Sequence, residues 1–212
     1  FLKILSYPFS VVFYLLFGIL LLLFEVIQRV CLNVFGYQAH KTSVDIVNGL
    51  FLVILHVVGT TFKFEISSEI PKNTPIIIAS NHQSLWDIPP IIWFLRKIHP
   101  KFISKIELGK GIPTVSYNLR KGGSVLIDRK NPAQATKEVE KIARYISKNN
   151  RSVVIFPEGT RSRDGVPKKF YRKGLITLFE HAPEAYVLPI SINNSWKLQR
   201  YGMFPIPLFT RL

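Results

Sequence analysis

Two uncharged apolar runs dominate the first third of the chain. Phe9–Phe24 and Ile46–Thr61 each contain sixteen residues without a charged side chain. Helices without a polar face are typical of segments that contact lipid or lie inside a core. Each run is shorter than the roughly 20 residues that a helix needs to cross the hydrocarbon layer. Gly36, Tyr37, His40 and Lys41 supply a turn between the runs.

We therefore expect residues 1–61 to form a hydrophobic two-helix hairpin that anchors the protein to a membrane, entering one leaflet or barely crossing it. Two buried core helices are the alternative. A cleaved signal peptide fits poorly, because no small-x-small cleavage site follows the first run.

From residue 62 the pattern changes to short β-branched runs that alternate with amphipathic segments. The predicted strands are Phe62–Ile66, Ile76–Ser80, Lys101–Ser104, Ser124–Asp128, Ser152–Phe156 and Val187–Asn193. The predicted helices are Trp86–Lys97, Pro132–Lys148 and Tyr171–His181. Strands separated by helices of this length indicate βαβ units. Residues 62–212 are therefore predicted to form an α/β domain, with a largely parallel mixed sheet flanked by helices.

The charge of the chain lies in this second part. The net charge is +15, and the first 70 residues contain four basic and four acidic groups, so the whole excess belongs to residues 71–212. A basic domain behind an apolar segment favours contact with an anionic membrane or an acidic substrate. Nucleic acid is a weaker candidate, because the aromatic residues gather in the apolar segment and the strands.

Cysteine and histidine usage excludes other classes of site. Cys31 is the only cysteine, so an internal disulfide is impossible. The five histidines show no spacing typical of metal ligands. We therefore expect no metal and no bound cofactor.

The segment Ala79–Asp87 carries the first candidate chemistry. It follows an apolar strand, so His82 is expected on a turn at the edge of the sheet where open α/β folds bind ligands. Asp87 lies five residues on, near the start of a helix, and could fold back onto one imidazole nitrogen. The other nitrogen would then take a proton from a substrate hydroxyl. Alternatively, Asp87 only caps the helix and His82 is a turn residue.

A second loop, Phe156–Arg163, also follows an apolar strand. It brings together two arginines, two hydroxyls and flexible backbone. Arginine makes bidentate contacts with phosphate, hydroxyls add donors, and glycine lets the backbone approach closely. This loop therefore suits a phosphate monoester, although an exposed basic loop with a turn at Asp164-Gly165 would read similarly.

Two further segments are less distinctive. Lys105, at the end of a predicted strand, could supply a second cation for phosphate, whereas Arg129 could equally pair with a neighbouring acid. Val187–Ser191 contains a proline and is expected at the edge of the sheet, with core packing as its role.

Taken together, these segments resemble the glycerolipid acyltransferase family, which includes the bacterial 1-acylglycerol-3-phosphate acyltransferases. Four family blocks occur in order: NHQSLWD with its H-x-x-x-x-D core, SKIELGKGIP to GGSVLIDR, FPEGTRSRDG, and VLPISI. They span about residues 79–191. In the second block Ile106 stands where the family often has a lysine, and Lys105 precedes it.

The resemblance implies an α/β fold without metal, with His82 as general base and Asp87 as its partner. It also implies that a lysophosphatidate phosphate is bound by Arg161 and the rest of its loop, namely Glu158, Gly159, Thr160 and Ser162, together with Lys105. The implied reaction takes an acyl group from acyl-CoA or acyl-carrier protein to the sn-2 hydroxyl of lysophosphatidic acid and gives phosphatidic acid.

Other functions remain open on the sequence alone. The acceptor could be another lysolipid, such as lyso-ornithine lipid, or the protein could be a hydrolase in which His82 activates water. It could also bind membrane lipid without catalysis. Because the acyl donors are cytoplasmic and the domain is basic, we expect it at the cytoplasmic face of the inner membrane.

Overall fold

The structure is a computed structural model and describes residues 2–66 and 69–212. Its centre is a five-stranded sheet in the order β3-β2-β4-β1-β5, and every pairing is parallel. The strands are β1 (Ile76–Ser80), β2 (Pro100–Lys105), β3 (Val125–Ile127), β4 (Ser152–Ile155) and β5 (Tyr186–Ile190). All carboxyl ends therefore meet at one edge of the sheet.

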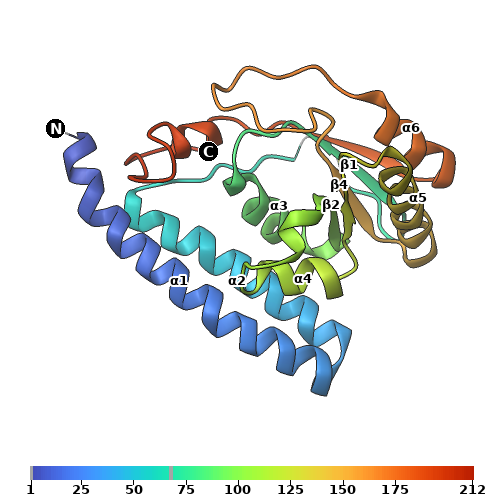
Figure 1. The fold of residues 1–212 in the computed structure, drawn as a ribbon, viewed down its shortest axis with the longest axis horizontal. Helices are drawn as coiled ribbons and strands as arrows, with labels where there is room; N and C mark the ends of the chain where they lie inside the picture. Colours follow the sequence, from blue (N-terminus) through green and yellow to red (C-terminus); the bar gives the residue numbers. More distant parts are fainter. Residues whose placement is uncertain (1, 67–68) are drawn as a thin grey trace.

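Helices cover both faces of this sheet (Figure 1). Helices α5 (Pro132–Asn149) and α6 (Arg172–His181) pack on one face through a cluster that includes Ile142 and Leu178. Helix α3 (Ile88–Phe94) packs on the other face, together with part of α2 (Tyr37–Leu55). The predicted α/β fold is confirmed, and β5 lies at the edge that its proline suggested.

The start of α5 shows how local sequence sets an element. The Asn131 side chain accepts a hydrogen bond from the Gln134 amide at 3.0 Å, and Pro132 occupies the first helical position. Proline has no amide hydrogen to lose there, so this pair is a strong start signal. The helix ends at Asn149 because Asn150 adopts a left-handed conformation.

In residues 62–212, the body of the protein, one expected element is absent and one helix was not expected. The predicted strand Phe62–Ile66 does not form. The backbone amide of Lys63 instead donates to the Leu212 carbonyl at 2.8 Å, so this segment pairs with residues 211–212 and not with the sheet. Helix α4 (Val115–Lys121) was not predicted. It has only seven residues and begins two residues after Pro113. The glycine- and proline-rich stretch that ends at Pro113 is typical of a loop, so no sequence signal indicated a helix there.

The N-terminal hairpin is present, but its helices are longer than predicted. Helix α1 (Leu2–Phe35) contains 34 residues, about 51 Å at 1.5 Å per residue. The charged side chains of Glu25 and Arg29 do not end the helix, because they lie one turn apart and form an ion pair. The turn is confined to Gly36, with a φ of 81°, and Tyr37 already begins α2.

The two helices of the hairpin differ in exposure. By length and apolar composition, Leu2–Phe35 and Tyr37–Val58 could each cross a membrane. The helices are thus longer than the sixteen-residue runs from which a length below a full span was expected. Helix α1 leaves large apolar side chains such as Leu15 and Leu22 exposed, which suits contact with lipid. Helix α2 lies between α1 and the body and is mostly buried (Figure 1).

Candidate functional site

The candidate site begins at the carboxyl end of β1. The Asn81 side chain donates to the Ile192 carbonyl at 2.8 Å and accepts from the Ile192 amide at 2.7 Å. This pair of bonds ties the turn after β1 to the segment after β5. The next residue, His82, therefore sits on a turn held at both ends, at the edge where the parallel strands finish.

His82 is oriented by Asp87. Its Nδ1 lies 2.7 Å from Asp87 Oδ2, and the imidazole retains 18% exposure while the carboxylate is fully buried. The amides of Gln83 and Ser84 donate to the same oxygen at 2.7 and 3.0 Å. Because Oδ2 already accepts from two backbone amides, it acts as an acceptor toward the imidazole too, so Nδ1 is the donor and carries the proton. This leaves the Nε2 lone pair available for a substrate proton.

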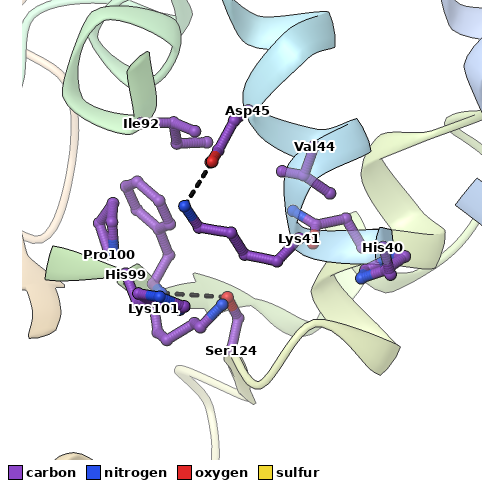
Figure 2. A pocket seen from close by; sticks show the side chains of 11 residues that line it. His40, Lys41, Val44, Asp45, Ile92, His99, Pro100, Lys101 and Ser124 are labelled. Carbon is purple, nitrogen blue, oxygen red and sulfur yellow. Dashed lines mark hydrogen bonds and ion pairs between the residues drawn. The ribbon is translucent and has the colours of Figure 1, made fainter. Parts of the chain in front are cut away.

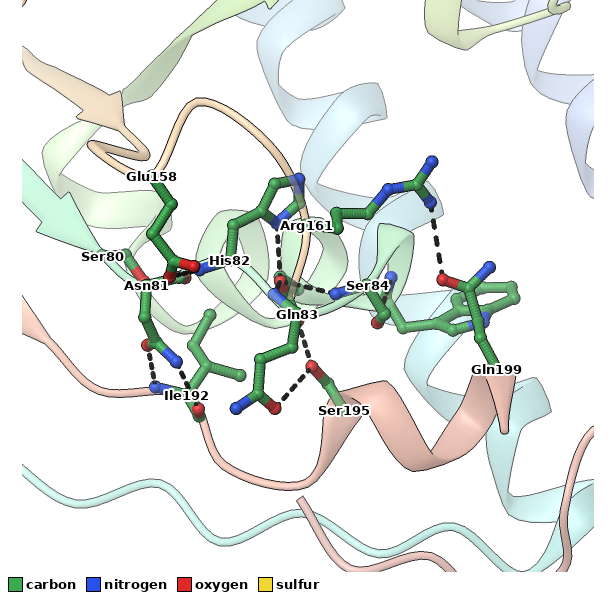
Figure 3. Close-up of polar contacts among 12 residues, drawn as sticks. Ser80, Asn81, His82, Gln83, Ser84, Glu158, Arg161, Ile192, Ser195 and Gln199 are labelled. Carbon is green, nitrogen blue, oxygen red and sulfur yellow. Dashed lines mark hydrogen bonds and ion pairs between the residues drawn. The ribbon is translucent and has the colours of Figure 1, made fainter. Parts of the chain in front are cut away.

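The other carboxylate oxygen of Asp87 has a partner from a distant segment. Ser195, fully buried, donates its hydroxyl to Asp87 Oδ1 and also lies 3.4 Å from Gln83 Oε1 (Figure 3). Asp87 thus accepts four hydrogen bonds, which together fix its position. Asp87 also caps the short helix Leu85–Asp87, because it completes a capping box with Ser84. The capping role and the contact with His82 therefore occur together.

The loop Phe156–Arg163 is hydrogen-bonded directly to the turn that carries His82, the histidine turn. Glu158, which is buried, accepts from the His82 amide at 2.9 Å through Oε1 and from the Lys168 amide at 2.9 Å through Oε2. The Ser162 amide in turn donates to the His82 carbonyl at 2.7 Å. The loop therefore folds over the histidine turn, and the Phe156 ring stacks on the imidazole with centroids 4.1 Å apart.

Within the loop, side chains differ in what they offer a ligand. Thr160 is exposed and Arg161 half-buried, whereas Ser162 is buried and donates its hydroxyl to Asp164 at 3.0 Å. The Val166 amide and the Ser162 hydroxyl both donate to Asp164 and lower the pKa of this carboxyl. Gly159 adopts a φ of 65°, which favours glycine. Arg161 and Arg163 flank Ser162, whose amide is bonded to the turn of His82; Arg161 is half-buried and Arg163 is exposed.

Lys105 lies at the same edge of the sheet. It is the last residue of β2 and is exposed. Strand β4, which leads into the Arg161 loop, lies between β2 and β1. The strand order therefore places this loop between the lysine and the histidine.

Comparison with known proteins agrees with this arrangement. The family model described as "Acyltransferase" matches residues 61–193, more than half of the chain. The chain belongs to the acyltransferase family.

Individual relatives are similar over shorter or longer stretches. A 1-acyl-sn-glycerol-3-phosphate acyltransferase of Limnanthes douglasii is 32% identical over 171 residues, covering 77% of this chain and 56% of the relative. One of Helicobacter pylori (strain J99) is 34% identical over 133 residues, covering 59% and 54%. The chain spans about half the length of the curated relatives it matches.

The fold has a solved counterpart in the same family. A crystal structure titled as the 1-acyl-sn-glycerophosphate (LPA) acyltransferase from Thermotoga maritima superposes with a TM-score of 0.75 and 25% identity. It covers 99% of this chain, and the chain covers 81% of that structure. The N-terminal hairpin is thus included in the similarity.

Sequence reasoning missed the segment that packs against this candidate site. The short 3₁₀ helix η5 (Ser195–Gln199) donates to Asp87 from its first residue, and its last residue, Gln199, accepts from Arg161 Nη1 at 3.4 Å (Figure 3). A serine 108 positions from its partner gives no sequence signal. The one local signal is the pair Asn193-Asn194 just before η5, because asparagine is common in turns and Asn194 adopts a left-handed conformation.

Residues 2–66 and 69–212 contain no group of three His, Cys, Asp or Glu side chains that could hold an ion.

Proposed function

We propose that the protein transfers an acyl group from acyl-CoA or acyl-carrier protein to the sn-2 hydroxyl of lysophosphatidic acid, giving phosphatidic acid. One observation carries the proposal: the turn that orients His82 against buried Asp87 is hydrogen-bonded to the loop that bears Arg161. Hydrogen bonds thereby join the segment of the proposed general base, His82, to the segment of an arginine suited to binding phosphate, Arg161. The relatives are named as acyltransferases of 1-acyl-sn-glycerol-3-phosphate, which supports the same acceptor.

In the reaction, Nε2 of His82 removes the proton of the hydroxyl as its oxygen attacks the thioester carbonyl. The carbon–sulfur bond then breaks, and the proton passes from the imidazolium to the leaving thiolate. Asp87 stabilises the imidazolium while it exists, because its carboxylate is 2.7 Å from Nδ1. A positioned general base typically contributes about 10²–10⁴-fold in rate.

The acceptor phosphate would be held by the loop and by Lys105. Arg161 offers a bidentate fork, and exposed Thr160 offers a hydroxyl. Glu158 and Ser162 act within this proposal by shaping the loop, since their polar atoms bond the histidine turn, Lys168 and Asp164. Gly159 supplies the turn with its positive φ.

The membrane supplies the acceptor. Residues 1–61 would be the membrane anchor and residues 62–212 the catalytic domain, with α1 in contact with lipid through its exposed apolar side chains. The +15 charge of residues 71–212 would hold the domain against anionic lipid at the cytoplasmic face, at about 1 kcal/mol per basic residue near the surface.

The decisive experiment measures acyl transfer to lysophosphatidic acid by purified protein in detergent, with each donor in turn. His82→Ala should lose about 10²–10⁴-fold in turnover, whereas His181→Ala, on α6, should retain it. Near-normal turnover of His82→Ala would contradict the assignment of the base. Transfer only to another lysolipid would move the acceptor, fatty acid release without acceptor would favour hydrolysis, and no turnover would favour lipid binding alone.

A further inference from the structure

A small polar cavity lies far from His82, at the opposite edge of the sheet. Six of the residues that line it are His40, Lys41, Asp45, His99, Lys101 and Ser124 (Figure 2). They come from the first turns of α2, the start of β2 and the residue before β3. Lys101 is the second residue of β2, so the cavity is at the amino edge of the sheet, whereas His82 follows the carboxyl end of β1.

The cavity contains a buried cation without a carboxylate partner. Lys101 is only 7% exposed, and among the described residues no carboxylate lies within 4.0 Å of its ammonium. The ammonium lies 5.3 Å from the centroid of the Tyr37 ring. Burial lowers the pKa of Lys101, the neighbouring Tyr37 side chain partly offsets this by raising it, and the charges of Arg151 and Lys41 lower it further. An isolated buried charge of this kind is costly unless something neutralises it.

The carboxylate that lines the cavity is already used. Lys41 donates to Asp45 and also to the Arg96 carbonyl at 2.7 Å. Asp45 and Lys41 therefore balance each other, and Figure 2 shows them bonded. The positive charge of Lys101 remains. Arg151, which lies with its guanidinium 4.4 Å from the Tyr37 ring, adds to the positive potential from outside the lining.

The neutral groups around Lys101 also lack partners. His40 is 1% exposed and neither ring nitrogen has a hydrogen-bond partner, and His99 Nδ1 has none. Ser124 Oγ accepts from the Phe102 amide at 3.1 Å, which leaves its own hydrogen to donate. Burial, with the charges of Lys41, Lys101 and Arg151, lowers the pKa of His99 to about 4, so its ring is neutral at pH 7. A neutral imidazole still has one N–H to donate.

We propose that this cavity binds one compact inorganic anion of the size of chloride, held by the ammonium of Lys101, the Ser124 hydroxyl and the N–H groups of His40 and His99. The space offers about 20 Å³ to the centre of an occupant of water size. That is enough for a single small ion and too little for a nucleotide or a lipid head group. A water molecule would satisfy the hydrogen bonds but would leave the charge of Lys101 uncompensated.

The anion would join the hairpin to the body. His40 belongs to α2, Lys101 to β2, and Ser124 precedes β3, so one ion contacts three separate elements. In the described part of the chain, none of these residues is hydrogen-bonded to His82, Asp87 or Arg161. The inference therefore stands or falls independently of the proposed acyl transfer.

The test is thermal unfolding of the purified full chain in detergent, with chloride replaced by gluconate at constant ionic strength. Chloride at ten times its Kd should raise Tm by about 3–6 °C. Lys101→Met should lose this dependence on chloride, whereas Lys148→Met, an exposed lysine of α5, should keep it. A Tm of the wild-type protein that does not respond to chloride would overturn the proposal, as would a response to sulfate or phosphate alone.

A second measurement does not depend on how the variant folds. In crystals grown or soaked with bromide, an anomalous peak should lie in contact with the Lys101 ammonium. A water molecule at that position, without anomalous signal, would overturn the proposal even if Lys101→Met proved unstable.

Discussion

Replacing Asp87 by asparagine separates the charge of this residue from its hydrogen bonds. The asparagine oxygen can take the position of Oδ2 and still accept from His82 Nδ1 and from the amides of Gln83 and Ser84. Its NH₂ group then takes the position of Oδ1 and can donate to the Ser195 oxygen. Because backbone amides fix which end is oxygen, the tautomer of His82 is retained in the variant.

The expected loss can be worked out from the geometry. His82 Nδ1 and Asp87 Oδ2 are 2.7 Å apart, which puts the delocalised charges of imidazolium and carboxylate about 4 Å apart and gives about 4 kcal/mol at an effective dielectric constant of about 20. At 1.36 kcal/mol per factor of ten, Asp87→Asn should lower kcat about 1,000-fold. KM should change little, because the imidazolium exists only after proton transfer.

Asp87→Ala provides the contrast in stability. It leaves the buried amides of Gln83 and Ser84 without an acceptor, at about 1–3 kcal/mol each, whereas Asp87→Asn keeps both bonds. Steady-state kinetics and thermal unfolding of both variants check the reasoning. A kcat for Asp87→Asn within tenfold of wild type would refute the role of the charge. An equal fall of Tm in both variants would refute the hydrogen-bond argument.

Three further changes have defined outcomes. Ser195→Ala removes one of four donors to Asp87 and should lower the free energy of unfolding by about 1.5–3 kcal/mol, with a smaller loss of kcat than Asp87→Asn. Arg161→Ala should raise the KM for lysophosphatidic acid and leave the KM for the acyl donor unchanged; the opposite pattern would contradict a phosphate role. The lowered pKa of His99, about 4 against 6.5, means that the unfolded chain binds the proton first as pH falls. Unfolding free energy should therefore drop by about 3 kcal/mol between pH 6.5 and 4, and His99→Gln should remove that part of the slope in pH-dependent denaturation.

The geometry of the candidate site was predictable where it depended on a short-range pattern. The spacing of His82 and Asp87 across a strand-to-helix turn predicted their contact, which is present at 2.7 Å. The position of the Arg161 loop after an apolar strand predicted that it would reach the same edge of the sheet. Both rules need only that the strands be parallel, and alternating strands and helices indicate this.

Contacts between distant segments were not predictable, because no local pattern encodes them. Ser195 reaches Asp87 across 108 positions, and Gln199 reaches Arg161 across 38. Glu158 was expected to bind substrate through its place in the loop, yet its carboxylate accepts the amides of His82 and Lys168. Its contact with substrate stays a prediction. In the structure its carboxylate holds the Arg161 loop against the turn of His82.

Helix α2 explains why an apolar run of sixteen residues could be assigned to a membrane and still lie mostly inside the protein. Its Val44 packs against the sheet cluster, and its Phe51 packs in the cluster that includes Phe13 of α1 and Trp86 beside Asp87. An apolar helix gains the same burial from protein as from lipid, so composition alone does not distinguish the two. Because Trp86 is shared between that cluster and the turn that holds Asp87, displacement of the hairpin would disturb the position of the candidate base. The N-terminal helices are therefore part of the framework of the candidate site.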